Sequence, residues 1–390
     1  MSDLLRPRSN HPLKSITLAI VLSIILFPSY LNIKKTILIL GMMIKMMVIR
    51  HLISILSIIL CCTLLSADFT SGTKIINEFV HCPIQDITLQ DDAFHGRGYL
   101  PFIEWWYFDA KFENGYTMVF TVQIIDLIVK NIVSTRLSIY NKGITVFKNY
   151  EKYSINEFSA SSEIPSITLA GKQLMVGTYN ASENCYFYNL NVEVPEGSLS
   201  LEFIGCTKGW KLQQKTGDWW GVILPRANVT GTMTLYSMRM NVTGIGYHDH
   251  NWHITPRIVS NFGWFWGTCY SSNYTFTWAE VYSSRVRKNP ILVVNEKDGG
   301  FLEIPSNEIS FLTKKTKLDH FKLIPWVLNI KTTSETIFLV INTEVISMEH
   351  TRFFGFIDYW RYHISFTGSI IKSNHMESIE GVSIMEYLRF

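Results

Sequence analysis

The side chains best suited to chemistry lie in one run of ten residues, Gly244–His253, which reads Gly-Ile-Gly-Tyr-His-Asp-His-Asn-Trp-His. The run holds three histidines, one carboxylic acid and one phenol, all of which can exchange protons. It follows a Thr-rich alternating stretch, Val229 to Val242, that predicts paired β-strands. Strands hold side chains rigidly, so this run is the first candidate for a catalytic site.

Side chains alternate between the two faces of a strand, which divides the run into two sets. Tyr247 and Asp249 then share one face with Asn251, while His248 and His250 share the other. On the first face, Asp249 could donate a proton beside the Tyr247 hydroxyl. A strand end tied down by hydrogen bonds would use the same residue types.

A metal site is the alternative for the second face. His248 and His250 form an H-x-H pair, and a third ligand such as His253 or His95 would have to complete it. No Cys-x-x-Cys or His-Glu-x-x-His motif accompanies the pair. The sequence therefore predicts neither a metal nor a cofactor.

Composition limits the classes of partner. Aromatic residues make up 14% of the 390-residue chain, which suits β-structure around apolar cavities. Residues 1–67 carry seven of the 35 Lys and Arg but one of the 32 acidic residues, so the remainder has a net charge of −3. Nucleic acid is therefore not an expected partner, because no basic excess is left to bind phosphates.

The amino-terminal residues 1–67 predict a signal peptide or a membrane segment. Leu52 to Leu65 is uncharged and mostly apolar, follows a basic flank and ends just before Ala67, the pattern of a cleaved secretory signal. If uncleaved, the segment would anchor the chain in a membrane. We expect an extracytoplasmic protein, secreted or membrane-anchored.

Glycosylation sequons and cysteines agree with export. Acceptor tripeptides begin at Asn180, Asn228, Asn241 and Asn273, which predicts a glycoprotein. Four cysteines follow the leader, and the pair that flanks an expected hairpin, Cys185 and Cys206, is the favoured disulfide.

Beyond residue 68 the pattern is that of an all-β protein. Short alternating segments recur between turns such as Asn114-Gly115, which is typical of sandwiches and barrels. The segments are Tyr116–Ile125, Tyr186–Val194, Ser198–Ile204, Gly231–Met240, Tyr274–Tyr282, Thr336–Val345 and His363–Ile371. Lys314-Lys315-Thr316-Lys317 is expected to be a solvated loop.

An internal echo predicts two related β-domains. An aromatic strand, a turn and a Tyr-Thr strand recur about 158 residues apart. The matched pairs are Trp106 with Trp264, Phe108 with Trp266, Tyr116 with Tyr274, Thr117 with Thr275, and Phe120 with Trp278. We place the domains at residues 68–240 and 241–390, with the polar run near their junction, a preferred place for a ligand pocket.

Four motifs resemble the AttH-like family of two-lipocalin-domain proteins, which includes carotenoid 1,2-hydratase (hydroxyneurosporene synthase). The motifs are Glu104-Trp105-Trp106-Tyr107 with His95 upstream, the Gly244–Trp252 run, Trp264-x-Trp266-Gly267, and Gly381-x5-Tyr387. Fungal Diels–Alderases have a similar architecture. The resemblance spans roughly residues 80 to 390, and the Gly-Tyr-His-Asp-His-Asn-Trp run is its most specific part.

The resemblance implies two packed lipocalin-like β-barrels, after the hydrophobic leader, around a long apolar cavity. It also implies that Asp249 protonates a terminal isoprenoid double bond without a cofactor, with Tyr247 and His248 as neighbours. The family usually has Gly after the Trp of the run, where this chain has His253. That departure bears on the substrate more than on the fold.

Physical chemistry supports such a reaction. A carboxyl buried among apolar groups stays protonated, and aromatic faces stabilise a cation. The expected substrate contacts are Trp105, Trp106, Trp252, Trp264, Trp266 and Glu104, the last of these as a second acid or base or, more simply, a structural partner. Water held by His248 or His250 would add to the cation. If both histidines face away from Asp249, that role must pass to another residue.

The sequence thus favours a cofactor-independent hydratase or cyclase acting on a hydrophobic isoprenoid or polyene. The alternative is a carrier that binds a lipophilic molecule without reaction. The direction of the Asp249 side chain separates the two: a carboxyl that faces solvent, or that an Arg holds, would favour the carrier.

Overall fold

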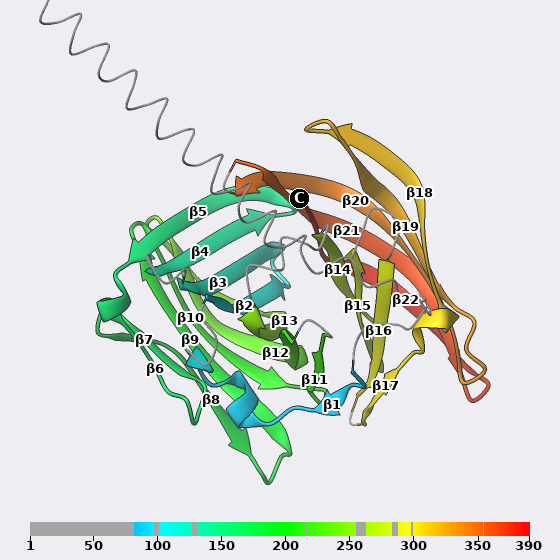
Figure 1. Ribbon diagram of the computed structural model, residues 1–390, viewed down its shortest axis with the longest axis horizontal. Coiled ribbons are helices and arrows are strands. Elements are labelled where there is room, and N and C mark those ends of the chain that lie inside the picture. The colour runs from blue at the N-terminus through cyan, green and yellow to red at the C-terminus, as the bar shows by residue number, and fades with distance from the viewer. Residues whose placement is uncertain are drawn as a thin grey trace, which may run out of the picture. The chain divides into compact units, whose positions relative to one another are not determined.

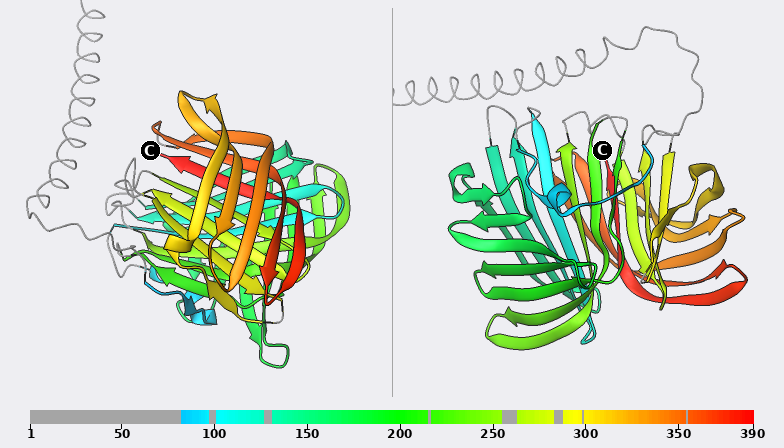
Figure 2. Two further views of the ribbon diagram at one scale, coloured as in Figure 1. Left: turned by 90° about the vertical axis from the view of Figure 1, so that its right-hand side faces the viewer. Right: turned by 90° about the horizontal axis from the view of Figure 1, so that it is seen from below.

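The computed structural model describes residues 82–96, 101–126, 131–214, 217–254, 263–282, 288–297, 299–353 and 355–390. These residues belong to one compact unit, Glu78–Phe390. They form two antiparallel sheets, of which the first curls into a nearly closed barrel and the second into a half-barrel (Figures 1 and 2). The all-β prediction is confirmed. The predicted leader, residues 1–67, lies outside the described residues.

The first sheet has 13 strands among the described residues. They are β1 (Gln85–Asp86), β2 (Phe102–Phe112), β3 (Tyr116–Asp126), β4 (Asn131–Asn141), β5 (Ile144–Tyr153), β6 (Phe158–Ala160), β7 (Ser166–Leu169), β8 (Lys172–Asn180), β9 (Cys185–Val194), β10 (Gly197–Gly205), β11 (Trp210–Gln213), β12 (Trp219–Leu235) and β13 (Met238–Ile254). Two short 3-10 helices, η1 (Leu89–Asp92) and η3 (Ile155–Glu157), accompany it.

The second sheet has nine strands within the described ranges. They are β14 (Gly263–Tyr270), β15 (Tyr274–Tyr282), β16 (Lys288–Glu296), β17 (Phe301–Glu303), β18 (Ile309–Asp319), β19 (Lys322–Thr332), β20 (Ile337–Phe353), β21 (Ile357–Lys372) and β22 (His375–Arg389), with the 3-10 helix η5 (Ser306–Glu308). The described residues contain no helix of the length and hydrophobicity of a membrane span.

The two sheets follow the same path. In the first, the order β5-β4-β3-β2 continues through β13, β12 and β10; in the second, β17-β16-β15-β14 continues through β22, β21 and β20. In both, the first long strand therefore pairs with the last strand of its own sheet. This shared order agrees with the internal echo.

The 158-residue offset of the echo matches β3 with β15 correctly, but it is wrong by one residue for β2 and β14. Phe120 on β3 and Trp278 on β15 both point into the core of their own sheet, as predicted. Trp106 also points into the first core, but Trp264 lies against the cluster between the sheets, where it stacks on Trp105. The true counterpart of Trp106 is Phe265. A slip of one residue reverses the facing of every side chain on a strand.

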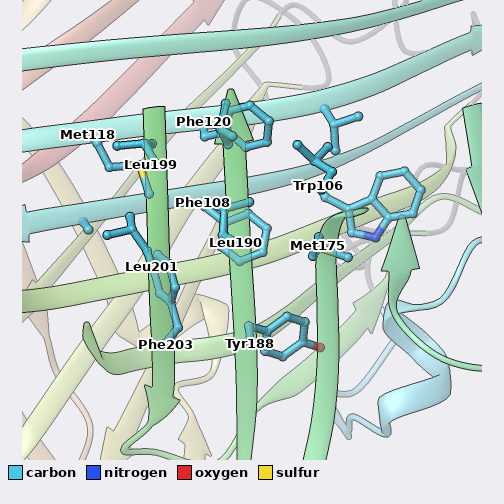
Figure 3. Close-up of a cluster of buried hydrophobic side chains, with 14 of the residues drawn as sticks. Trp106, Phe108, Met118, Phe120, Met175, Tyr188, Leu190, Leu199, Leu201 and Phe203 are labelled. Carbon is cyan, nitrogen blue, oxygen red and sulfur yellow. The ribbon is translucent and has the colours of Figure 1, made fainter. Parts of the chain in front are cut away.

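Three groups of buried apolar side chains hold the unit together. One fills the first barrel, where Trp106, Phe108, Phe120 and Phe203 converge from several strands (Figure 3). A second fills the concave face of the second sheet. The third joins the two sheets and includes Tyr247. We call this third group the seam; its members are Tyr107, Val119, Tyr140, Trp210, Leu212, Trp220, Val222, Tyr247, Trp266, Ala279, Ile291, Val293 and Ile384.

Several local predictions can be compared with the strands. The stretch Val229–Val242 forms the β12–β13 hairpin, so the segment Gly231–Met240 contains a turn at Tyr236 rather than one strand. Cys185 is not in a disulfide, and its thiol donates to Glu183, so the predicted bond to Cys206 is wrong.

The predicted boundary between residues 240 and 241 falls inside β13. That strand pairs with β2 and β12 of the first sheet as far as Ile254, and the second sheet begins at Gly263. The division into two domains stays a prediction, because residues 78–390 cluster as one compact unit.

Gly246 is required where β13 passes the first core. A Cβ there would lie 2.5 Å from Val229 Cγ2 and 2.6 Å from Phe203 Cε1. We expect Gly246→Ala to lower the free energy of unfolding by about 1–3 kcal/mol through overpacking, measured by urea denaturation.

Gly300→Ala is the matched control, because a Cβ at Gly300 meets nothing within 4 Å. Equal stability of the Gly246 and Gly300 variants would show that the packing argument is wrong.

Candidate active site at the seam

Strand β13 presents two polar sets on opposite faces, as its alternation predicts. Tyr247 belongs to the seam and donates a hydrogen bond to Asp249 on the same face, while His248 and His250 face the interior of the first barrel. The neighbouring strand β2 divides in the same way, because Tyr107 lies opposite Asp249 and Trp106 lies opposite His250. The chain therefore holds two separate polar sites, one on each side of a shared ladder.

Asp249 accepts hydrogen bonds from three side chains. Its Oδ2 accepts from the Tyr247 hydroxyl at 2.8 Å and from Trp220 Nε1 at 3.1 Å, and its Oδ1 accepts from the Asn251 amide at 3.2 Å. The residue is 6% exposed. Among the described residues, no Lys or Arg lies within salt-bridge distance of this carboxyl. Asp249 therefore has donors around it but no counter-ion.

The environment of Asp249 favours its neutral form. Burial raises the pKa of Asp249 to about 7, and the charges of Glu386 and Asp109 act in the same direction against the hydrogen bonds from Tyr247 and Trp220. A carboxyl with this pKa is poised to give and regain a proton near neutral pH.

Aromatic rings enclose this carboxyl. Trp266 lies 5.1 Å from Tyr247 and 5.5 Å from Tyr107 between ring centroids, and Trp210 packs edge-on against Trp220. The Nε1 of Trp266 is buried and has no hydrogen-bond partner among the described residues. The rings supply the negative faces that a carbocation would need.

The charged neighbours at the seam are already paired with one another. Arg361 Nε donates to Glu386 at 3.0 Å, and the Tyr107 hydroxyl donates to the same carboxylate oxygen at 3.0 Å. Lys111 is 2.6 Å from Asp109. Because each cation has its own partner, neither neutralises Asp249.

The opposite face of β13 holds a buried ionic network. His248 Nε2 lies 3.0 Å from Asp92 Oδ2, and His250 lies 3.3 Å from Asp92 Oδ1 and 3.0 Å from Glu104 Oε1. Glu104 also accepts from the backbone N–H groups of His95 and Gly96. The structural role expected for Glu104 fits these donors, although its role in a reaction stays untested.

The charges of this network reinforce one another. Burial lowers the pKa of His250, but the hydrogen bonds and charges of Asp92 and Glu104 outweigh it and raise the pKa to about 9. Burial likewise opposes ionisation of Asp92, yet the charge and hydrogen bonds of His248 and His250 lower its pKa to about 2. The result is a compact ion cluster that stays charged at neutral pH.

The two tryptophans of this face serve the same network. Trp106 stacks on His250 at 4.3 Å and donates through Nε1 to the Asp92 carbonyl oxygen. Trp252 stacks on His95 at 4.5 Å. The predicted substrate contacts thus separate into two groups, with Trp105, Trp264 and Trp266 at the seam and Trp106, Trp252 and Glu104 in the first barrel.

The geometry gives the histidines little capacity to bind a metal. His248 Nδ1 faces the Tyr107 carbonyl oxygen at 2.9 Å and must carry a proton, because that oxygen only accepts. Its Nε2 is engaged by Asp92. Across the described ranges, no three His, Cys, Asp or Glu side chains are arranged to hold a metal ion. His253, which has a positive φ of 55°, packs edge-on against His95.

Sequence reasoning missed two residues that contact the candidate site residues. Trp220 had the pattern of an ordinary core residue, yet its Nε1 binds Asp249. Asp92 lies in η1, more than 150 residues from the histidines it pairs with, and no local spacing signals that contact. The only usable clue was general, since buried histidines require acceptors.

The long apolar cavity implied by the resemblance stays a prediction. A pocket of about 610 Å³ lies elsewhere, between β3, β5 and the β12–β13 turn, and is lined by Tyr116, Val146, Leu235, Tyr236, Ser237 and Met238. None of the residues in either polar site lines it.

Comparison with known proteins shows the fold class. No family model and no curated protein matches the sequence. Among solved structures, a Nitrosomonas europaea protein provisionally described as AttH matches with a TM-score of 0.55 at 13% identity, over 82% of this chain and 98% of that one. This likeness supports the expected AttH-like architecture at the level of the fold.

Two further structures are more distant. Kievitone hydratase from Nectria haematococca has a TM-score of 0.48 at 13% identity, over 74% of this chain and 88% of its own. CghA, solved with Sch210972, has a TM-score of 0.47 at 12% identity, over 74% of this chain and 89% of its own.

The raised pKa of Asp249 makes a stability prediction. The folded protein binds this proton more tightly than the unfolded chain, so the free energy of unfolding falls as pH rises from about 4 to about 7. Asp249→Asn removes that fall, so it should gain on the order of 4 kcal/mol relative to the native chain between pH 4 and pH 8. Urea denaturation at both pH values measures the gain.

Asp86→Asn, at a carboxylate that is about two-thirds exposed, should show no such pH-dependent gain. If the two variants behave alike, Asp249 titrates in its ordinary range.

His250 makes a second stability prediction. His250→Ala leaves Asp92 and Glu104 buried without this cation, which should cost about 3–5 kcal/mol at pH 6. Because the pKa is raised to about 9, the stabilisation is complete below pH 6.5 and is lost as pH rises through 9. Denaturation at pH 6 and pH 10 measures both, with exposed His375→Ala as the control. A loss independent of pH would rule out the charged pair.

Proposed function

We propose that this protein is a cofactor-independent hydratase or cyclase that protonates an alkene of a hydrophobic isoprenoid or polyene from Asp249. One observation carries the proposal: Asp249 is a buried carboxyl with a pKa of about 7, held by neutral donors and surrounded by aromatic rings. Protonation of an isolated alkene requires an acid that is still protonated at working pH.

The reaction begins when the Asp249 O–H proton transfers to one alkene carbon. The π-electron pair forms the new C–H bond, and the other carbon becomes a tertiary cation. Trp266, Tyr107 and Trp105 present aromatic faces at the seam, and each face can stabilise a desolvated cation by about 2 kcal/mol. The carboxylate left behind is stabilised by Tyr247, Trp220 and Asn251.

The second half restores the acid. In hydration, water adds to the cation and its spare proton returns to the Asp249 carboxylate, so one residue acts first as acid and then as base. In cyclisation, a second alkene attacks the cation and the product loses a proton to the same carboxylate. Either course balances without an oxidant or reductant.

His248 and His250 take no part in this scheme. They face Asp92 and Glu104 on the other side of β13, and their hydrogen bonds are satisfied there. The water-activating role considered for them therefore passes to Asp249. The histidines keep a structural role, since they fix the strand that carries the acid.

The carrier remains the alternative, and the surroundings of Asp249 weigh against it. A carrier gains nothing from a titrating carboxyl inside an apolar layer, because burial of such a group costs free energy. Solvent exposure or an Arg partner at Asp249 would favour the carrier, but this carboxyl is buried, and the nearby Arg361 is bound to Glu386.

Asp249→Asn tests the proposal, because it keeps the shape of the side chain and removes the acid. Purified protein is incubated with an isoprenoid and polyene extract in ¹⁸O-labelled water, and products that gain labelled water or isomerise are identified by mass spectrometry. We expect turnover to fall at least a thousandfold in the variant, with substrate binding retained.

Asp86→Asn serves as the control and should turn over like the native chain. Unchanged turnover by Asp249→Asn contradicts the acid role. A lipid that co-purifies and is always returned unchanged establishes the carrier instead.

A further inference from the structure

The turn between β18 and β19 carries a phenylalanine in a place that disfavours it. Phe321 is 100% exposed and has a positive φ of 62°, next to His320 with φ of 45°. Bulky side chains rarely adopt this conformation, and an exposed Phe ring loses its hydrophobic stabilisation. Both penalties fall on Phe321, which indicates that its ring contacts a partner other than this chain.

Three other hairpin turns place Gly or Asn at a positive φ, whereas the β12–β13 turn has Tyr236 with φ of 55°, whose ring packs edge-on against Phe147. Gly143 follows Lys142 between β4 and β5, Gly171 lies between β7 and β8, and Asn374 lies between β21 and β22, all with positive φ. Gly and Asn suit such turns because they tolerate left-handed backbone. The β18–β19 turn differs from all four, because Phe321 is fully exposed where Tyr236 still packs on a neighbouring ring.

Phe321 is the centre of an apolar tip. Leu318 and Leu323 are direct cross-strand partners just behind the turn, and they are 66% and 67% exposed. Phe356, in the β20–β21 turn, is 56% exposed. We call Leu318, Phe321, Leu323 and Phe356 the apolar tip.

The β18–β19 and β20–β21 turns lie at the same end of the strands of the second sheet. The ring of His320 stacks on His350 of β20 at 3.6 Å, and Lys322 Nζ is 2.9 Å from Asp358 of β21. Trp360 also donates to the Asp319 carboxylate at 2.7 Å. These contacts fix the base of the β18–β19 hairpin, which projects beyond the neighbouring strands at that end (Figures 1 and 2).

Lysines flank the apolar tip. Lys314, Lys315 and Lys317 are exposed on β18, so the stretch predicted to be a loop is instead part of a strand. Lys317 lies over the Trp326 ring at 4.5 Å, which holds its charge near the hairpin. An apolar tip with lysines behind it suits the surface of a lipid bilayer, which has an apolar interior and anionic head groups.

We propose that the apolar tip inserts into the interfacial layer of a lipid bilayer, with the β18 lysines on anionic head groups. A convex turn with one aromatic ring and two leucines suits a bilayer, which yields around it. A protein partner would have to offer a matching pocket. The inference does not depend on the reaction at Asp249, although a bilayer also dissolves the lipophilic class of substrate proposed there.

Photolabelling tests the proposal on the full chain. Vesicles of phosphatidylcholine and phosphatidylserine at 4:1 carry a diazirine on the acyl chain, and labelled tryptic peptides are identified by mass spectrometry. Trypsin releases the tip as Leu318–Lys322, which is distinct from any amino-terminal peptide. We expect this peptide to be labelled, and Phe321→Asn to reduce its labelling at least tenfold.

Two matched controls sharpen the result. Phe338→Asn, at a half-exposed Phe on β20, should leave labelling of the tip unchanged. Phe321→Asn should unfold at or above the native temperature, because Asn tolerates the positive φ. Replacing Lys314 or Lys315 by Gln, or omitting phosphatidylserine, should lower labelling, by about fivefold per lysine.

Three outcomes overturn the proposal. The first is equal labelling of the tip in the native chain and in Phe321→Asn. The second is no labelling of the Leu318–Lys322 peptide. The third is a dimer in sedimentation that Phe321→Asn dissolves, which would assign the tip to a second copy of this chain.

Discussion

The register of β13 between β2 and β12 is the constraint on which both polar sites depend. Because side chains alternate along a strand, this pairing sends Asp249 to the seam and His250 into the first barrel. A slip of one residue would exchange the two environments. Direct cross-strand stacking holds the register, with His248 on Phe108 at 3.8 Å and His250 on Trp106. Gly246 has no Cβ, which leaves room for the side chains of Val229 and Phe203 beside β13.

The two sites use opposite electrostatic solutions to burial. In the first barrel, the acids and histidines stabilise each other's charged forms, so His250 and Asp92 remain charged. At the seam, the cations are already occupied, Arg361 by Glu386 and Lys111 by Asp109. Asp249 has hydrogen-bond donors but no cationic partner among the described residues, and burial raises its pKa. One strand, β13, thus carries a charged cluster on one face and, on the other, a carboxyl whose surroundings favour its neutral form.

Much of the local structure could be predicted from periodicity. Alternation located β3, β9, β10, β15, β20, β21 and the β12–β13 hairpin, and the echo located the β2–β3 and β14–β15 hairpins. Periodicity could not predict two other features. The facing of Trp264 depends on a one-residue difference between two hairpins, which an offset of 158 cannot resolve. The run Lys314–Lys317 looked like a loop because its lysines lie on both faces of an exposed strand.

The sequence by itself determined that Tyr247 and Asp249 face together, away from His248 and His250, because strand geometry alone sets that alternation. It also determined the all-β class. The tertiary structure decided what each face meets. Asp92 reaches the histidines from η1, and Trp220 and Glu386 reach the surroundings of Asp249 from β12 and β22. Such contacts between distant segments follow from the pairing of whole strands, and local spacing carries no record of them.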